Sequence, residues 1–409
     1  MKERLTTVIL ILALVALPAI AQEEQAKSDE ELLQKANKLI HDALVIDGHC
    51  DTVMGALRGQ IDLSARNEEG HIDIPRMLEA GLDTQFFACF TSPRDLEASP
   101  ETTLAMLDVL HQTAEKDDRF VIVNTADDIL KAKKAGKIAC IPAIEGGHSL
   151  AGDIRLMRDY RRLGVRYLTL TWNNSNEFAD SSTPDQSNYG DLPNRGGLTD
   201  LGRELVKEMN RIGVIIDVSH VHDDTFWDVI EVSSKPIIAS HSCCWAINPV
   251  NRNLKDDMLK ALVRNGGVVG INYYNGFLSK EYADATEGFW PTARVKRQEI
   301  MEQYKDDEEA IHREWRKYVT EVRAGWPKVP MSVLVDHIDH VVKVAGIDHV
   351  GLGSDFDGIS DAPVGLEDVT GMVNIVVELL RRGYSEEDIR KILGENFLRV
   401  IRANDVDWS

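Results

Sequence analysis

Residues with metal-binding side chains recur in this sequence directly after short apolar runs. They are His49, Asp51, Glu145, His220 and His241. Imidazole and carboxylate groups are ligands that suit zinc. One His-x-Asp tripeptide is common by chance and is explained as well by a hydrogen-bonded turn, and a single buried histidine is usually structural. The recurrence of these residue types after several apolar runs favours a metal site instead.

The spacing of His49 and Asp51 matters because both residues follow an extended segment. Side chains two positions apart in extended chain point to the same side, so Cys50 between them points to the opposite side. The carboxylate of Glu145 has two oxygens and can bridge two cations. Together with His220 and His241, these residues supply the donors that a two-metal hydrolytic site requires.

A second group of polar residues could act on a substrate. Asp355 and Asp357 in GSDFDG would lie on one side of an extended chain, and a carboxylate there could serve as general base and then as general acid. Arg252 in NPVNRNL could bind a substrate carboxylate or be a solvated loop residue, and its spacing does not decide between them. His337 and His340 fall in a helical run, and we interpret them as structural.

The elements that must position these residues are short β-rich runs that alternate with amphipathic helical stretches. The runs are 43–51, 83–90, 138–146, 166–173, 213–220, 236–242, 267–274 and 349–358. Near-continuous apolar strands that alternate with helices indicate a parallel sheet covered by helices. Eight such units favour a (β/α)8 TIM-like barrel, whose strands would bring the polar residues to one face; a doubly wound sheet is the alternative.

Two stretches between the strands have features of their own. Residues 198–213 predict a helix with Thr199 as its N-cap and Gly213 at its end. Residues 277–330, which are charged and contain three tryptophans, break the rhythm before the last strand. We interpret them as a helical insertion on the face where the strands end and expect a solvated decoration without a catalytic part; an insertion that covers or narrows the pocket is the alternative.

The charge and the two ends of the chain limit the partners and the compartment. A net charge of -21, from 67 acidic and 46 basic residues, repels phosphate backbones and excludes nucleic acid as a partner. Residues 1–21 match a signal peptide, which predicts export to the periplasm or the extracellular space and leaves 22–409 as a single domain. Their apolar run is short for a bilayer span, so we expect no stable membrane anchor. The five cysteines show no disulfide framework.

Several motifs together resemble the membrane dipeptidase (renal dipeptidase) family of the metal-dependent amidohydrolase superfamily. They are DGHCDT, AIEGGHS, RYLTLT, GLTDLGRELVKEMNRIGVIIDVSH, ASHS, NRN and DHIDHVVKVAGIDHVGLGSDFDG. The resemblance covers about residues 42–402. It implies a zinc-dependent hydrolase that cleaves the peptide bond of dipeptides, and a homodimer is compatible with it.

The resemblance also implies roles for the metal ligands. His49 and Asp51 would hold one of two zinc ions per subunit, His220 and His241 would hold the other, and Glu145 would bridge both. A hydroxide between the metals would then attack the peptide carbonyl of the dipeptide.

The same resemblance assigns the remaining residues around the metals. Asp355, rather than Asp357, would carry the proton from the attacking group to the leaving amine. Arg252 and Tyr274 would receive the terminal carboxylate of the substrate and nearby groups. Trp172 would contact substrate at the position where the best-known members carry a histidine.

Trp172 is therefore the main departure from the family pattern. Indole donates one hydrogen bond and cannot carry charge, so stabilisation of the transition state would differ. A second hypothesis follows, an amidohydrolase of the same fold that acts on other amides, N-acyl amino acids or lactones. A third, an exported binding protein without turnover, is disfavoured because all five ligands and Asp355 are present.

Overall fold

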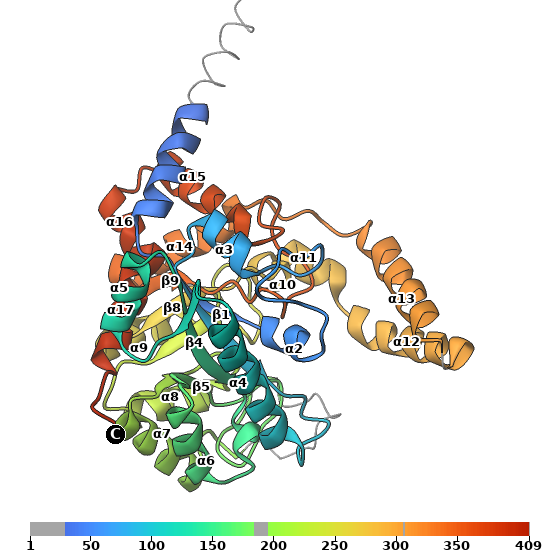
Figure 1. Cartoon of the computed structure of the whole chain (residues 1–409), viewed down its shortest axis with the longest axis horizontal. Coiled ribbons are helices and arrows are strands. Elements are labelled where there is room, and N and C mark those ends of the chain that lie inside the picture. Colours follow the sequence, from blue (N-terminus) through green and yellow to red (C-terminus); the bar gives the residue numbers. More distant parts are fainter. Residues whose placement is uncertain (1–28, 184–194, 306, 409) are drawn as a thin grey trace, which may run out of the picture.

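The computed structural model describes residues 29–183, 195–305 and 307–408, and at its centre eight parallel strands form a closed barrel (Figure 1). The barrel strands are β1 (Ile46–Cys50), β2 (Thr84–Phe90), β4 (Ile138–Glu145), β5 (Tyr167–Thr169), β6 (Ile215–Asp217), β7 (Ile238–Ser242), β8 (Val268–Ile271) and β9 (Val350–Leu352). The ring closes because β1 pairs with both β2 and β9, and β2 pairs with β4. The predicted barrel is confirmed, and the doubly wound alternative is excluded.

Each of the eight predicted runs contains one barrel strand, but most strands are shorter than the runs. One further strand, β3 (Phe120–Ile122), was not predicted and pairs with the first residues of β4. It lies at the end of the barrel opposite the carboxyl ends of the strands. The shorter strands mean that several predicted site residues lie in the loops just beyond them.

Helices cover the outside of the barrel and connect its strands. They are α2 (Thr52–Leu57), α3 (Ile74–Ala80), α4 (Ser99–Lys116), α5 (Ala126–Lys134), α6 (Ile154–Arg162), α7 (Asp200–Ile212), α8 (Asp223–Val232), α9 (Asp256–Asn265), α14 (Ser332–Ala345), α15 (Val373–Arg381), α16 (Glu386–Arg390) and α17 (Asn396–Ala403). A further helix includes residues 29–42. The predicted boundaries of α7 are confirmed: the Thr199 hydroxyl accepts a hydrogen bond from the Gly202 N–H, and Gly213 ends the helix with φ 72°.

Two apolar layers hold the barrel and its helices together. The inner layer includes Ile46, Phe86 and Ile215 from alternate strand positions, and Phe397 of α17 packs against Phe86 at 6.2 Å between ring centroids. The outer layer lies between the strands and the helices and includes Cys50. Cys50 therefore faces the helices, as predicted, whereas Ile46, four residues earlier, faces the inside, because the pairing of β1 with β2 shifts register between Asp47 and Cys50.

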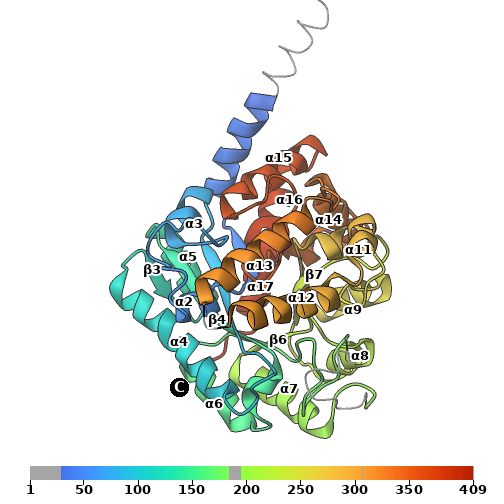
Figure 2. The same cartoon turned by 90° about the vertical axis from the view of Figure 1, so that its right-hand side faces the viewer.

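The insertion before the last strand consists of four helices. They are α10 (Asn275–Leu278), α11 (Lys280–Thr286), α12 (Phe289–Tyr304) and α13 (Glu308–Arg323). Helices α12 and α13 form a hairpin that projects from the body in Figure 1 and crosses in front of the barrel in Figure 2. The two views together place the hairpin over one end of the barrel.

Two predictions concern the membrane and the N-terminus. The predicted signal peptide, residues 1–21, lies outside the described residues. Among the described residues, no helix is long and apolar enough to cross a membrane.

Candidate metal centre

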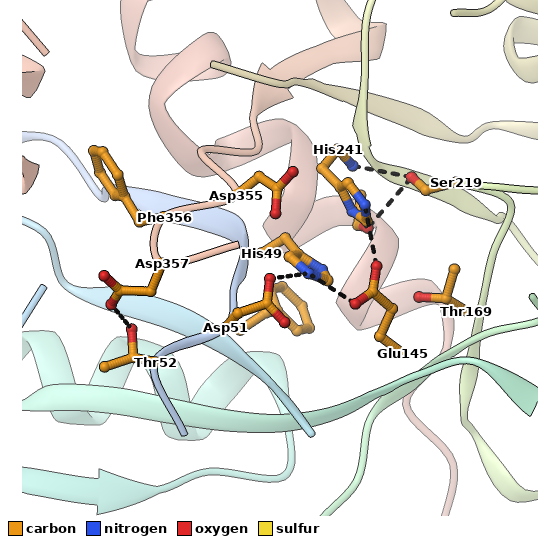
Figure 3. Close-up of polar contacts among 12 residues, drawn as sticks. His49, Asp51, Thr52, Glu145, Thr169, Ser219, His241, Asp355, Phe356 and Asp357 are labelled. Atoms are coloured by element: carbon orange, nitrogen blue, oxygen red, sulfur yellow. Dashed lines mark hydrogen bonds and ion pairs between the residues drawn. The ribbon is translucent and has the colours of Figure 1, made fainter. Parts of the chain in front are cut away.

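The five residues predicted as metal ligands meet at the carboxyl ends of the barrel strands, and Figure 3 labels four of them, His49, Asp51, Glu145 and His241. Glu145, the last residue of β4, lies at the centre of the group. Its Oε1 is 2.9 Å from His220 Nε2 and 3.5 Å from His241 Nε2, and its Oε2 is 3.9 Å from His49 Nε2. Asp51 Oδ2 is 3.4 Å from the same His49 nitrogen. One carboxylate therefore faces donors from three other strands.

The donor atoms form overlapping sets that could each hold a metal ion. Within each set, one ligand atom from every residue lies within 4.8 Å of the others: His49 with Asp51 and Glu145, Glu145 with His220 and His241, and His49 with His241 and Asp355. Glu145 belongs to the first two sets. This sharing is the geometry that a carboxylate bridge between two cations requires.

Several atoms of the cluster have no partner that would explain their burial. His49 Nε2 and Asp51 Oδ1 are buried without a hydrogen bond. His220 Nε2 and His241 Nε2 lie 3.0 Å apart. Buried polar atoms in folded proteins almost always have a partner, so unpaired donors that converge on one carboxylate fit a bound cation. The residues present therefore fit a metal centre.

Hydrogen bonds behind the imidazoles orient them toward the cluster. His220 Nδ1 lies 3.0 Å from Asn173 Oδ1, His241 Nδ1 lies 2.7 Å from Ser240 Oγ, and His49 Nδ1 lies 2.6 Å from Tyr167 Oη. The Asn173 oxygen is an acceptor, and Ser240 donates its own proton elsewhere, so Nδ1 of His220 and of His241 carries the hydrogen. Each Nε2 then presents a lone pair to the cluster, as metal-binding histidines do.

Asp217, the last residue of β6, anchors this support. Its Oδ2 accepts hydrogen bonds of 2.6 Å from both the Ser240 and Thr169 hydroxyls, and its Oδ1 accepts from the N–H groups of Ser240 and Ser219. The sequence analysis missed Asp217, Ser240 and Asn173 as supporting residues. For the first two, the signal was present in the DVSH and IASH patterns, which place them just before His220 and His241.

The charges of the cluster follow from its burial. Burial raises the pKa of the Glu145 carboxyl well above its usual range, and the Asp51 carboxylate raises it further. Burial lowers the pKa of the His220 and His241 imidazoles well below their usual range, so both rings are neutral. Burial also opposes protonation of His49, but the Asp51 and Glu145 carboxylates raise its pKa to about 10. Two imidazoles of the cluster, those of His220 and His241, are therefore neutral nitrogen donors, whereas the neighbouring carboxylates hold His49 in its protonated form, and a bound cation would take the place of that proton.

The two aspartates after β9 do not point the same way. Asp355 and Asp357 have φ values of 60° and 66°, so the chain turns instead of extending, and the prediction that both lie on one side is wrong. Asp355 Oδ2 accepts a 2.8 Å hydrogen bond from Asn272 Nδ2 at the cluster, and burial raises the pKa of Asp355 to about 7. Asp357 instead accepts hydrogen bonds from Thr52 Oγ1 and from the His71 N–H.

Backbone conformation at the site is unusual. His220 is also left-handed, with φ 66°, and left-handed backbone at a residue other than glycine costs about 1–3 kcal/mol. A Cβ at Gly358 would overlap the carboxylates of Asp51 and Asp355, and one at Gly146 would overlap the ring of His148. The glycines after Glu145 and Asp355 therefore allow the close approach that the cluster requires.

A cavity of about 760 Å³ opens from the cluster toward the surface. Arg252 lines it and is buried, with its guanidinium Cζ 5.1 Å from the centroid of the Phe277 ring. Its Nη2 donates to the His241 carbonyl at 3.4 Å, and its Nε is buried without a partner. One edge of this guanidinium is therefore available to an anionic group in the cavity.

Trp172 and Tyr274 also line the cavity, in loops beyond β5 and β8. The Trp172 ring is half-buried and lies 4.8 Å from the ring of Phe90 and 6.3 Å from that of His220, between centroids. Tyr274 precedes α10, and its N–H donates to Asn272 Oδ1 at 2.6 Å. Both residues thus lie within the same cavity as the cluster.

The insertion contributes to this cavity, which corrects the expectation that it is a solvated decoration. Trp290 of α12 and His312 and Arg316 of α13 line the cavity. Arg316 Nη1 lies 2.6 Å from Oε1 of Glu69, which belongs to the loop between α2 and α3. The sequence of the insertion could not show that it lines the cavity, because Arg316 meets Glu69 from a distant part of the chain, across the mouth of the barrel.

His337 and His340 lie in α14, away from the cavity. His337 Nδ1 accepts from the Cys244 N–H at 3.0 Å, so its Nε2 donates to the Leu278 carbonyl at 2.9 Å. His340 Nε2 lies 2.7 Å from Asp256 Oδ1. These contacts agree with a structural role. All five cysteines are free and buried, so the expectation of no disulfide framework is confirmed.

Comparisons with known proteins agree with this geometry. The family model described as membrane dipeptidase (Peptidase family M19) matches residues 33–407. The chain is 32% identical over 401 residues to an uncharacterized dipeptidase of Schizosaccharomyces pombe, an alignment that covers 93% of this chain and 85% of that protein.

Two solved structures extend the comparison. The probable dipeptidase PvdM from Pseudomonas aeruginosa is similar with a TM-score of 0.79 and 25% identity, over 92% of this chain and 98% of that one. A metallo peptidase from Rhodobacter sphaeroides, liganded with a phosphinate mimic of L-Ala-D-Ala, is similar with a TM-score of 0.72 and 26% identity, over 89% of this chain and 99% of that one.

Proposed function

The chain belongs to the membrane dipeptidase family, Peptidase family M19, and from that premise we propose that its buried cluster binds two zinc ions and hydrolyses the peptide bond of dipeptides. Membership makes the protein a metallodipeptidase and confirms the predicted resemblance. The identity and number of the metals and the role of each side chain form the proposal. The observation that carries it is Glu145, which two donor sets share.

In this proposal, His49 and Asp51 hold one ion, His220 and His241 hold the other, and Glu145 lies between them. Nitrogen and carboxylate donors in a small set suit zinc better than magnesium or calcium, which prefer oxygen ligands alone. When bound, the two ions would supply an acidified water near neutral pH and polarise the carbonyl of the scissile bond.

Arg252 and the cavity walls orient the substrate. The unpartnered Nε of Arg252 can join Nη2 in a two-point, charge-assisted contact with the terminal carboxylate of a dipeptide. Tyr274 and Trp172, on the walls of the same cavity, contact the remaining groups of the substrate. Binding energy from these contacts holds the scissile bond over the cluster.

Asp355 moves the proton in this reaction. It accepts a proton from the attacking water and returns it to the nitrogen of the leaving amine, so that a peptide bond and water become a carboxylic acid and an amine, and the acid then gives its proton to the amine to form a carboxylate and an ammonium group. Asn272 holds one carboxylate oxygen of Asp355 at 2.8 Å. The other oxygen, Oδ1, lies beside Gly358, as does the Asp51 carboxylate, since a Cβ built on this glycine would meet both groups. Oδ1 of Asp355 is therefore close to Asp51 at the cluster.

One observation favours a second candidate function. Trp172, with its ring 6.3 Å from that of His220, stands where the best-known family members carry a histidine. An apolar wall beside the cluster would suit N-acyl amino acids, other amides or lactones of the same shape. A side-by-side assay of these compounds and dipeptides separates the two functions.

The test uses the purified, zinc-loaded protein with a mixed library of L,L and L,D dipeptides, N-acyl amino acids and lactones, and identifies products by mass spectrometry. The Asp355→Asn variant should lower kcat for dipeptides by about 10²–10⁴-fold, with zinc content unchanged. Asp357→Asn is the matched control, because the Asp357 carboxylate accepts hydrogen bonds from Thr52 and His71. This substitution should lower kcat less than about tenfold.

Two results would count against the proposal. A folded, zinc-loaded protein that cleaves no dipeptide of the library would remove the proposed reaction. An Asp355→Asn variant as active as Asp357→Asn would remove the proposed proton carrier.

A further inference from the structure

The cavity extends well beyond the metal cluster, and aromatic rings line its wall from Trp172, beside His220, to the exposed Trp290, around which lies the part that we call the outer cavity. The rings belong to Phe90, Trp172, Tyr274, Phe277 and Trp290. These residues come from four segments, namely the end of β2, the loop after β5, the region around α10, and α12. Aromatic side chains that converge from separate elements form a surface that suits a large apolar group, because each ring offers a wide contact area.

Trp290 is the contribution of the insertion to this wall. Its side chain is 48% exposed although it lines the cavity. It is held at the base of the hairpin, with its ring 5.1 Å from that of Phe289, which in turn lies 4.9 Å from the Trp326 ring. An anchored indole with so much exposed surface is available for contact with a ligand.

The charged groups that line the outer cavity offer less selectivity for a substrate than the aromatic rings do. Arg316 is paired with Glu69, and Asp357 is held by Thr52 and His71. Arg58 and His312, which also line the cavity, are exposed, where water and salt weaken the attraction between a charged side chain and an anion. The apolar surface is therefore the main selective feature of the outer cavity.

We infer that the outer cavity selects dipeptides that carry a bulky aromatic or branched apolar side chain, and that Trp290 of the insertion is a specificity-determining residue for them. This inference rests on the proposed dipeptidase function and names its substrate class. A small dipeptide such as Ala-Ala reaches Arg252 and the cluster but leaves the Trp290 ring uncovered. A dipeptide with a Phe side chain removes the Trp290 surface from water.

The experiment compares kcat/KM for Ala-Ala, Phe-Ala and Ala-Phe in the zinc-loaded wild-type protein and in Trp290→Ala. Loss of one apolar wall is expected to lower kcat/KM about tenfold for the preferred Phe-containing dipeptide, and less than about twofold for Ala-Ala. Trp290→Phe keeps an aromatic ring and should retain most of the difference in kcat/KM between the Phe-containing dipeptide and Ala-Ala. The two Phe-containing substrates show which position of the dipeptide meets the wall.

Trp315→Ala is the matched control. It removes the same side chain from α13 of the hairpin, where the indole packs against Tyr318 and the Arg297 guanidinium and does not line the cavity. It should leave the ratio of kcat/KM for the Phe-containing dipeptide and Ala-Ala unchanged. A Trp290→Ala variant that lowers kcat/KM equally for both substrates, or for neither, would overturn the inference.

A second measurement keeps this result separate from the proposed chemistry. Calorimetry of the same dipeptides with the zinc-loaded Asp355→Asn protein needs no turnover. Trp290→Ala in that background should weaken binding of the Phe-containing dipeptide about tenfold and leave Ala-Ala unchanged. A wild-type protein without dipeptidase activity would refute the proposed reaction. If the protein with Trp290→Ala and the protein without it bound the Phe-containing dipeptide with equal affinity, that result would refute the selectivity.

Discussion

The metal cluster and the α12–α13 hairpin face the same cavity, but they are built in opposite ways. The cluster residues His49 and Glu145 are 0% and 3% exposed and lie within or at the ends of barrel strands. Among the described residues of the hairpin, by contrast, only Phe289, Ala293 and Ile300 of α12 and Ala310 of α13 are buried. The first region is fixed by the core of the barrel, and the second is held mainly at its base.

This difference suggests a division of labour within one cavity. Reacting groups must keep their positions within a fraction of an ångström, which buried strands and a supporting layer of hydrogen bonds provide. A thinly packed hairpin can change its surface without disturbing those strands. The chemistry is thus expected to depend on the barrel, and the choice of substrate on the insertion.

The largest effect is expected from Glu145→Gln, which tests the cluster side of this comparison. Glutamine keeps the shape of the side chain but loses the charge that His49, His220 and His241 face. Loss of the shared ligand should reduce bound zinc and lower kcat/KM for dipeptides about a thousandfold, since a metal supplies several kcal/mol of transition-state stabilisation. Plasma mass spectrometry of the protein and a dipeptide assay measure the two effects.

Glu69→Gln is the control for that experiment. Glu69 also lines the cavity but pairs with Arg316 of the hairpin, so the same chemical change there should leave zinc content unchanged. Retention of both zinc ions and full activity by Glu145→Gln would show that the shared carboxylate is not a ligand. It would also contradict the expectation that the chemistry depends on the barrel cluster.

A smaller effect is expected from Ser240→Ala, which tests whether the supporting layer fixes the cluster. The Ser240 hydroxyl accepts from His241 Nδ1 and donates to Asp217. Its removal should weaken zinc binding about 10–100-fold, as loss of a partner behind a metal ligand usually does. Competition with a chelator measures the affinity.

Ser242→Ala is the matched control, because Ser242 is buried on the same strand and, among the described residues, its hydroxyl hydrogen-bonds only to the Ser219 hydroxyl, at 3.4 Å. It should change zinc affinity less than about twofold. Equal effects of the two substitutions would mean that general loosening of β7, and not the orientation of His241, controls the affinity.

The barrel and the meeting of the five candidate ligands could be predicted from the sequence because both depend on local patterns. Each strand is a short, nearly continuous apolar run, and a parallel barrel brings the ends of all such runs to one face. Once the barrel is assumed, polar residues such as Glu145 and His241 must lie near each other. The N-cap at Thr199 was predictable for the same reason, since it depends on the residues beside it.

The remaining features depend on contacts that no local pattern encodes. The directions of Asp355 and Asp357 follow from left-handed backbone, which aspartate adopts only when the surroundings impose it. The role of Asn272 depends on its distance from Asp355 across two strands. The contribution of Trp290 depends on how the insertion folds back over the barrel, which the spacing of its residues does not determine.

The smallest effect is expected from Arg316→Ala, which tests the hairpin side of the comparison. The Arg316–Glu69 pair joins α13 to the loop between α2 and α3, but its side chains are 68% and 76% exposed, so the pair should contribute at most about 1 kcal/mol. Its loss should raise KM for a Phe-containing dipeptide about threefold, with kcat for Ala-Ala and the melting temperature unchanged. Glu69→Ala should have the same effect, and the double variant should add nothing, because both remove one interaction. A fall of kcat for Ala-Ala in Arg316→Ala would show instead that the hairpin takes part in the chemistry, since neither residue of the ion pair belongs to the metal cluster.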